Sequence, residues 1–318
     1  MKKYFVLLLA VSLVISSCKK EQIELLTQEV DAHTSLPLFD VFFANDSIGY
    51  ICGGDKYNKG IFLKTSDGGK MWNTPDSIIP KAAYAQYFFN ANEGFVGGYD
   101  TWLAYTADSG KTFSAQPSYE LETQDISFGD HLHGVRVNGS GYADGKILST
   151  NNGGSSWTTT AILSNGFRCV TFSDATTVFA GGYGVIYKST DAGQTFFPLD
   201  IRGDFFVATD FPSANVGYFA GFQGVILKTS DAGNSFSKVM KENTPFAKRE
   251  HFEAIDFIDD DNGFVAGDNG LMYQTTDGGN NWKKVKQFTD TNLRDIHLFS
   301  ATSGIAVGDN GKIFLFRN

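Results

Sequence analysis

The stretch Thr275-Thr276-Asp277-Gly278-Gly279-Asn280-Asn281-Trp282 occurs six times in this chain, with small variations. The shared pattern is Ser or Thr, any residue, Asp or Asn, any residue, Gly, two further residues, and Trp or Phe. The Asp or Asn can accept hydrogen bonds from backbone N–H groups just ahead of it, the Gly permits a positive φ, and the aromatic ring can pack beneath the turn. The pattern therefore predicts a repeated hairpin tip. Its structural Asp or Asn positions are Asp67, Asp108, Asn152, Asp191, Asp231 and Asp277.

The copies of this turn begin at intervals of 39 to 46 residues. A period of about 40–45 residues is the size of a four-stranded propeller blade. Upstream of the last copy, residues 254–257 alternate apolar with polar, residues 263–267 are apolar between two glycines, and residues 268–270 are Asp-Asn-Gly. Alternation predicts a strand with one core face, and Asp-Asn-Gly predicts a tight hairpin turn. Each unit is thus predicted to contain three strands, the repeated turn and a fourth strand.

The first strand of the unit recurs seven times rather than six. Its copies centre on Phe43, Phe88, Phe128, Phe172, Phe211, Phe257 and Leu298. The seventh unit has three predicted strands and no fourth, whereas residues 23–30 precede the first unit at the distance of a fourth strand. We therefore predict an all-β fold: one seven-bladed β-propeller of four-stranded antiparallel blades over residues 23–318. The N-terminal strand is predicted to close the ring, which removes an open sheet edge.

The N-terminus carries the features of a targeting segment. Lys2 and Lys3 precede an apolar run that is short for a membrane span. Ile15-Ser16-Ser17-Cys18 then resembles a bacterial lipobox. We predict a lipoprotein signal peptide at residues 1–17, lipidation of Cys18 and a tether at residues 18–22; the alternative is an ordinary secretory signal with a chance cysteine. The expected location is outside the cytoplasm, as a membrane-anchored lipoprotein that is periplasmic or on the cell surface.

The charge and cysteine content of the sequence limit the kinds of partner and cofactor that we expect. The formal net charge is −9, and removal of Lys2 and Lys3 would make the chain more acidic. Nucleic-acid binding depends on clustered Lys and Arg, so no nucleic-acid partner is expected. Cys52 and Cys169 are predicted three blades apart, too far for a disulfide, and hence to be free thiols. No Cys/His metal spacing is present in the sequence, so no metal or cofactor is predicted, and we expect a monomer.

The repeated turn resembles the Asp-box, the sialidase-type (BNR) repeat, and we use that name for it below. The lipidated sevenfold repeat resembles the photosystem II stability/assembly factor family of β-propellers and its bacterial relatives, over nearly all of residues 23–318. This resemblance implies a non-catalytic scaffold that binds a membrane protein subunit, in some members through a patch of Arg at the start of the first strand. The equivalent positions here are Phe39, Tyr84, Gln124, Arg168, Val207, Glu253 and Arg294. The chain departs from the Arg pattern at all but two of them.

The repeat order separates two faces of the predicted propeller. The loops between strands 1 and 2 and the Asp-boxes lie on one face; the turns between strands 2 and 3 and the blade connections lie on the other. This box-free face carries most of the aromatic and Arg residues in predicted loops. We predict that it binds a protein or cell-envelope partner without catalysis. The predicted binding residues are Arg168, Arg294, Arg202, Arg249, Tyr183, Phe222 and His251.

Glycan binding or hydrolysis is the alternative function. Asp-box enzymes of the sialidase type use three Arg, a Tyr nucleophile paired with a Glu, and an Asp acid/base, whereas this chain has six Arg in all. Asp268 and Asp309 occupy equivalent turns and are the candidate carboxylates, although Asp before Asn-Gly is also ordinary turn chemistry. A close carboxylate pair in a deep cleft would favour a glycosidase, whereas separated acids around a shallow funnel would favour a scaffold.

Overall fold

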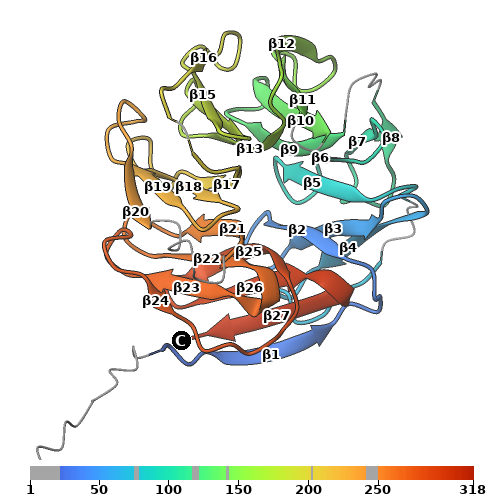
Figure 1. Cartoon of the computed structure of the whole chain (residues 1–318). Helices are drawn as coiled ribbons and strands as arrows, with labels where there is room; N and C mark the ends of the chain where they lie inside the picture. Colours follow the sequence, from blue (N-terminus) through green and yellow to red (C-terminus); the bar gives the residue numbers. More distant parts are fainter. Residues whose placement is uncertain (1–21, 75–78, 117–121, 141–142, 202, 241–249) are drawn as a thin grey trace, which may run out of the picture.

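The computed structural model describes residues 22–74, 79–116, 122–140, 143–201, 203–240 and 250–318. Their strands form seven antiparallel sheets around a central axis, as predicted (Figure 1). Each blade is given from its innermost to its outermost strand: the first contains β2 (Leu38–Phe43), β3 (Gly49–Asp55) and β4 (Lys59–Thr65); the second β5 (Ala83–Phe88), β6 (Gly94–Gly98), β7 (Leu103–Thr106) and β8 (Ser114–Ala115); the third β9 (Thr123–Phe128), β10 (Gly134–Ser140), β11 (Ala143–Thr150) and β12 (Thr158–Leu163). The fourth contains β13 (Phe167–Phe172), β14 (Val178–Gly182), β15 (Val185–Ser189) and β16 (Phe197–Pro198); the fifth β17 (Phe206–Asp210), β18 (Gly217–Gly221), β19 (Ile226–Thr229) and β20 (Ser237–Met240); the sixth β21 (Phe252–Phe257), β22 (Gly263–Gly267), β23 (Met272–Thr275) and β24 (Lys283–Lys284). The seventh contains β25 (Leu293–Ser300), β26 (Ser303–Gly308), β27 (Lys312–Arg317) and β1 (Leu26–Asp31).

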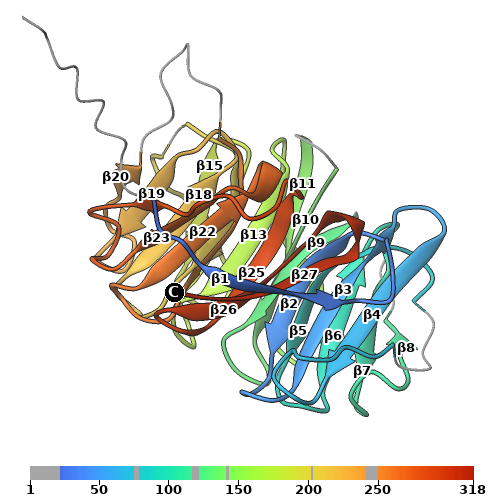
Figure 2. The same cartoon turned by 90° about the horizontal axis from the view of Figure 1, so that it is seen from below.

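The N-terminal strand closes the ring. β1 pairs antiparallel with β27 from Leu26↔Arg317 to Asp31↔Lys312, so the last blade takes its outer strand from the start of the fold. Figure 2 shows β1 lying along β27 across the side of the molecule. Ahead of β1, Ile23 forms a parallel bridge with Val285 of the preceding blade. The first blade is the irregular one: among the described residues, its fourth strand is reduced to a single bridge between Lys64 and Asn73.

The Asp-boxes have the predicted geometry. In the first copy, Asp67 Oδ1 accepts hydrogen bonds from the backbone N–H groups of Lys70 and Met71, both at 3.0 Å, and from the Thr65 hydroxyl at 2.8 Å. Gly69 has a φ of 83°, in the left-handed region that favours glycine. Trp72 is buried and donates from Nε1 to the carbonyl of Gly69 at 3.0 Å. The turn thus satisfies its own polar groups while its aromatic ring packs beneath it.

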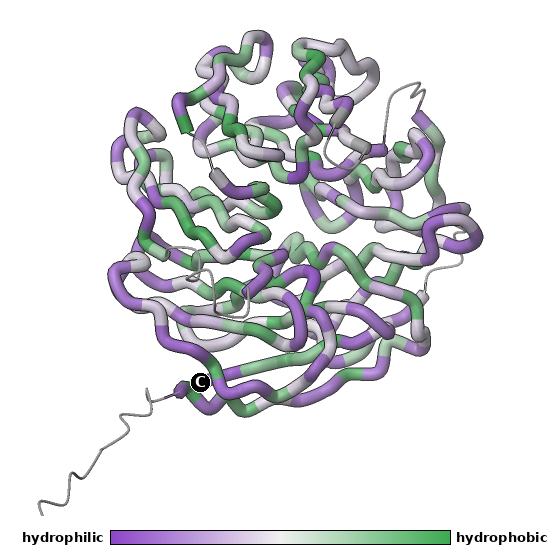
Figure 3. The backbone as a smooth tube through the Cα atoms, viewed as in Figure 1, coloured by the Kyte–Doolittle hydropathy of each residue, from purple (hydrophilic) through white to green (hydrophobic). Residues whose placement is uncertain are grey.

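The described residues form seven apolar clusters, which lie between neighbouring blades rather than in one central core. Strand two of each blade is buried on both sides, as in β22. Its first residue is usually a Gly opposite an aromatic residue of strand one: a Cβ on Gly263 would lie 2.5 Å from the ring of Phe257. Apolar segments accordingly follow the strands in Figure 3, and hydrophilic segments are common in the outer loops.

Half-buried carboxylates join neighbouring blades around the channel. Each accepts a hydrogen bond from a backbone N–H of the next blade's innermost strand, at 2.6–2.8 Å. The pairs are Asp40 with Gln86, Asp125 with Val170, Asp210 with Phe257, Asp256 with Leu298 and Asp295 with Val41. We call these five aspartates the channel ring. Because burial disfavours the charged form, the pKa is raised to about 7 for Asp40, about 8 for Asp125 and about 6 for Asp210, and well above its usual range for Asp256 and Asp295.

The fold confirms two sequence predictions about residue chemistry, the free thiols and the tight turn. Cys52 and Cys169 are buried free thiols, as predicted. Asn269 and Gly270 both have positive φ, 56° and 68°, so Asp268-Asn269-Gly270 is the expected tight hairpin turn. No helix in the described part of the chain is long and apolar enough to cross a membrane. The predicted signal peptide, Cys18 and most of the tether lie outside the described residues.

Candidate binding site at the channel mouth

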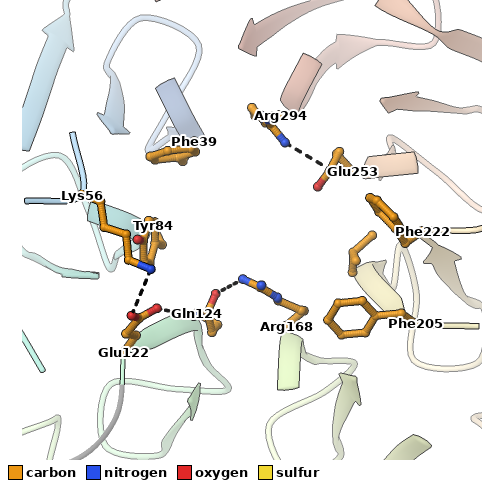
Figure 4. Close-up of a pocket in the computed structure, with 11 residues that line it drawn as sticks. Phe39, Lys56, Tyr84, Glu122, Gln124, Arg168, Phe205, Phe222, Glu253 and Arg294 are labelled. Atoms are coloured by element: carbon orange, nitrogen blue, oxygen red, sulfur yellow. Dashed lines mark hydrogen bonds and ion pairs between the residues drawn. The ribbon is translucent and has the colours of Figure 1, made fainter. Parts of the chain in front are cut away.

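A cavity of about 630 Å³ opens on the box-free face, at the mouth of the central channel. It is lined by the first-strand positions of all seven blades, so the sequence register that aligned these positions is confirmed. Two blade connections and two turns between strands 2 and 3 contribute the other side chains. The lining residues are Phe39, Tyr84, Gln124, Arg168, Val207, Glu253 and Arg294 from the first strands, and Lys56, Glu122, Phe205 and Phe222 from the loops (Figure 4).

Arg168, on β13, differs in its contacts from Lys56 and Arg294, the other cations that line this cavity. It donates a hydrogen bond to Gln124, and its guanidinium carbon lies 5.6 Å from the centre of the Phe205 ring. Among the described residues, no carboxylate lies within ion-pair distance of Arg168. The contact with the Phe205 ring and one hydrogen bond to the side-chain amide oxygen of Gln124 therefore orient the guanidinium and leave its charge available to a bound anion.

Arg294, on β25, has a different role although it occupies the equivalent position. Its Nε and Nη2 each donate to the Asp309 carboxylate at 2.9 Å, and Nη1 lies 3.3 Å from Glu253 Oε1. A bidentate pair of this kind is strong and fixes the side chain. Burial raises the pKa of Glu253, and the charge of Arg294 opposes that rise. Arg294 is thus held by neighbours within the propeller, and its charge is compensated.

The opposite wall of the cavity is aromatic and partly charged. The rings of Phe39 and Tyr84 meet edge-to-face with 5.4 Å between their centroids. Lys56 Nζ lies 3.6 Å from Glu122. Burial and the charge of Glu122 raise the pKa of Tyr84, which disfavours the phenolate that a tyrosine nucleophile requires. This wall is suited to apolar and hydrogen-bonding contact rather than to catalysis.

The structure brings together some of the predicted binding residues. Arg168, Arg294 and Phe222 line the channel-mouth cavity. Tyr183 lies outside it, and its ring is 5.7 Å from that of Phe205, which does line it. His251 stacks on Phe222 with 4.1 Å between ring centroids and faces a second, smaller cavity. Arg202 and Arg249 lie outside the described residues.

The candidate carboxylates of the glycosidase alternative are not arranged as a pair across the cavity. Asp309 is bonded to Arg294, and Asp268 Oδ2 lies 3.1 Å from His251 Nδ1. Neither lines the channel-mouth cavity, whose own acids, Glu122 and Glu253, come from the third and sixth blades and are each ion-paired. Within the described residues, no group of three or more His, Cys, Asp or Glu could hold a metal ion.

Sequence reasoning missed several lining residues. Lys56, Glu122 and Phe39 were not predicted as binding residues, yet they form a large part of the cavity wall. Phe39 could have been found, because it belongs to the same repeat position as Arg168 and Arg294. Lys56 and Glu122 lie in connections of irregular length, for which the repeat supplies no register.

Fold, repeated turns and channel-mouth cavity together define an Asp-box β-propeller of the seven-bladed class. Residues 19–118 and 197–289, more than half of the chain, match the model of the family described as photosynthesis system II assembly factor YCF48. The chain belongs to this family. No curated protein is similar enough to count as a match.

Solved structures share the fold at low sequence identity. A YCF48 bound to a D1 peptide is 18% identical, with a TM-score of 0.73 over 94% of this chain and 100% of that one. YCF48 from Cyanidioschyzon merolae is 19% identical, with a TM-score of 0.70 over 92% of this chain and 98% of that one. An ancestral GH74 enzyme is 16% identical, with a TM-score of 0.68 over 88% of this chain and 45% of that one. At these identities the likeness establishes the fold alone.

Proposed function

We propose that this protein is a non-catalytic assembly and binding scaffold whose box-free face holds a polypeptide segment of a cell-envelope partner. The observation that best supports this proposal is the channel-mouth cavity. There the positive charge of Arg168 lies between aromatic side chains, with no carboxylate at ion-pair distance among the described residues. Aromatic residues and Arg are the side chains that most often anchor protein interfaces. Family membership supports a protein partner, because a YCF48 has been solved with a D1 peptide bound.

The glycan alternative has weaker support. The acids at the channel mouth are ion-paired with Lys56 and Arg294, and the pKa of Tyr84 is shifted away from the one that a nucleophile needs. Glycoside cleavage requires two carboxyl groups that face the substrate, one protonated to act as the general acid and one ionised to act as the base or nucleophile. The arrangement in this cavity favours binding without bond cleavage.

Affinity capture from membranes of the source cells tests the scaffold. Wild type, Arg168→Gln and the exposed control Arg317→Gln would be compared by quantitative mass spectrometry. We expect partners retained by wild type and the control to be depleted at least fivefold with Arg168→Gln, because the available cation is removed. Equal recovery by all three would contradict the role of Arg168. Release of sugars from an envelope glycan by the purified protein would overturn the non-catalytic assignment.

We also propose that Cys18 is acylated and anchors the propeller to a membrane surface outside the cytoplasm. The support is the lipobox-like sequence Ile15-Ser16-Ser17-Cys18 after a basic and apolar segment. Metabolic labelling with a palmitate analogue is expected to mark wild type and to leave Cys18→Ser unlabelled. Labelling of both proteins, or membrane partitioning of a processed Cys18→Ser protein equal to that of wild type, would refute the anchor.

A further inference from the structure

A second cavity of about 330 Å³ lies beside the channel-mouth cavity and is lined by residues of the sixth blade and its neighbouring loops. Phe222 lines the channel-mouth cavity, and His251 lines the second one. Their rings are stacked, with 4.1 Å between centroids. One pair of stacked rings therefore separates the two cavities, and a single extended chain segment can cover both.

Most charged groups that line the two cavities compensate one another. The pairs are Lys56 with Glu122, Arg294 with Glu253, and Lys284 with Glu250. Arg168 in the first cavity and Asp268 in the second are different: within the described residues, neither has an oppositely charged Lys, Arg, Asp or Glu at ion-pair distance. Among the described residues that line the two cavities, Arg168 is thus a cation without a carboxylate partner and Asp268 is a carboxylate whose charged partner is at most His251, and the two lie on either side of Phe222.

The second cavity is suited to a long basic side chain. Asp268 Oδ2 is bonded to His251 Nδ1 at 3.1 Å, and the Asp268 side chain keeps 26% of its surface exposed. Leu271 and Val285 line the same cavity and are buried. The aliphatic stem of Lys or Arg can pack on such apolar groups while its charged head meets a carboxylate.

We propose that Asp268 binds a Lys or Arg side chain of the same partner segment whose acidic group pairs with Arg168. This inference rests on the proposed function and gives its ligand a chemistry: a polypeptide segment with an acidic and a basic residue on either side of an apolar residue that covers Phe222. Complementary charges at two separated points select partner and direction, because a segment with two like charges places one of them against a like group.

Binding of matched peptide pools to the full chain in detergent tests this chemistry. The parent pool contains fluorescein-labelled, end-blocked dodecapeptides of Gly and Ser with one Asp, one Arg, and a Leu between them, separated by two to six residues in either order. One control pool has Gln in place of Arg, and the other has Asn in place of Asp. Fluorescence anisotropy at low salt measures binding by wild type, Asp268→Asn and Arg168→Gln, and thermal melting checks that each variant is folded.

We expect wild type to bind the parent pool at least tenfold more tightly than the pool without Arg, and Asp268→Asn to lose this discrimination to within twofold. Tenfold discrimination retained by Asp268→Asn would overturn the inference. If Arg168→Gln weakens binding while Asp268→Asn binds like wild type, the inference alone fails and the proposed function stands. If Arg168→Gln binds every pool as wild type does, the binding role of the channel mouth fails as well.

Discussion

Raising the pH from 6.5 to 8.0 should destabilise this propeller, because the channel ring holds protons that the unfolded chain does not. The pKa of Asp125 is raised by burial to about 8 and that of Asp40 to about 7, whereas an unfolded Asp titrates near 3.9. A carboxyl group with a raised folded pKa stabilises the fold while it stays protonated, and that stability is lost as the pH rises through the folded pKa.

The size of the effect follows from these values. Between pH 6.5 and 8.0, linkage gives a loss of roughly 1.5 kcal/mol for Asp125 and a little under 1 kcal/mol for Asp40. The total of about 2 kcal/mol corresponds to a fall in Tm of roughly 4 °C for a domain of this size. Asp256 and Asp295, whose pKa is also raised well above its usual range, change the stability in the same direction. Burial lowers the pKa of His297 to about 4, and an unfolded His titrates near 6.5, so this residue offsets the loss by less than about 0.5 kcal/mol.

Urea unfolding at several pH values, followed by circular dichroism, measures the loss. The variant Asp125→Asn keeps an oxygen that can accept the Val170 N–H but cannot titrate, so we expect its pH-dependent loss to be smaller by roughly 1.5 kcal/mol. The control is Asp231→Asn, because hydrogen bonds from Ser235 hold the pKa of Asp231 at about 2, far below the window. Stability that is flat or rises from pH 6.5 to 8.0 in wild type would refute the reasoning.

Three further predictions concern the architecture. Gly263→Ala should lower the free energy of unfolding in urea by about 1–3 kcal/mol, because the new Cβ would lie 2.5 Å from the Phe257 ring. That ring stacks on Tyr218 with 3.7 Å between centroids, and an unchanged unfolding midpoint would show that it can move. Asp191→Ala should lower the free energy of unfolding by about 1–2 kcal/mol, because Asp191 accepts the hydrogen bonds of its Asp-box turn. Asp191→Asn should lower it much less, since Asn152 accepts the equivalent bond in another Asp-box, and equal losses would contradict this account. Deleting residues 22–32 should broaden the thermal transition by exposing β27, and an equally sharp transition would argue against closure by β1.

The sequence predicts the fold well because each blade repeats the same local chemistry. The six-residue spacing between Phe257 and Gly263 reflects one contact, in which the ring lies over a glycine on the paired strand. The Asp-Asn-Gly turn requires two consecutive positive φ values, which Asn and Gly tolerate best. Closure could also be predicted, since a missing fourth strand at one end matches an extra strand at the other.

The charge state of the site could not be predicted in the same way. Arg168 and Arg294 occupy equivalent positions, yet Asp309 neutralises only Arg294. The difference arises because the turn between β26 and β27 carries Asp309 to Arg294 on β25 of the same blade. The repeat pattern gives no local signal for this contact. The channel ring was also missed, although an Asp recurs one or three residues after the aligned position in five of the first strands.

Pairing β1 with β27 also makes completion of the ring depend on both ends of the folded chain. Glu29 and Lys312, which form an ion pair across these strands, are 283 positions apart. A contact between residues so far apart in sequence carries a large loop-closure cost, and contacts of this kind slow folding. On the proposed export route, the last blade can be completed only after both β1 and β27 have crossed the membrane, so the two ends of the fold are coupled in one late step.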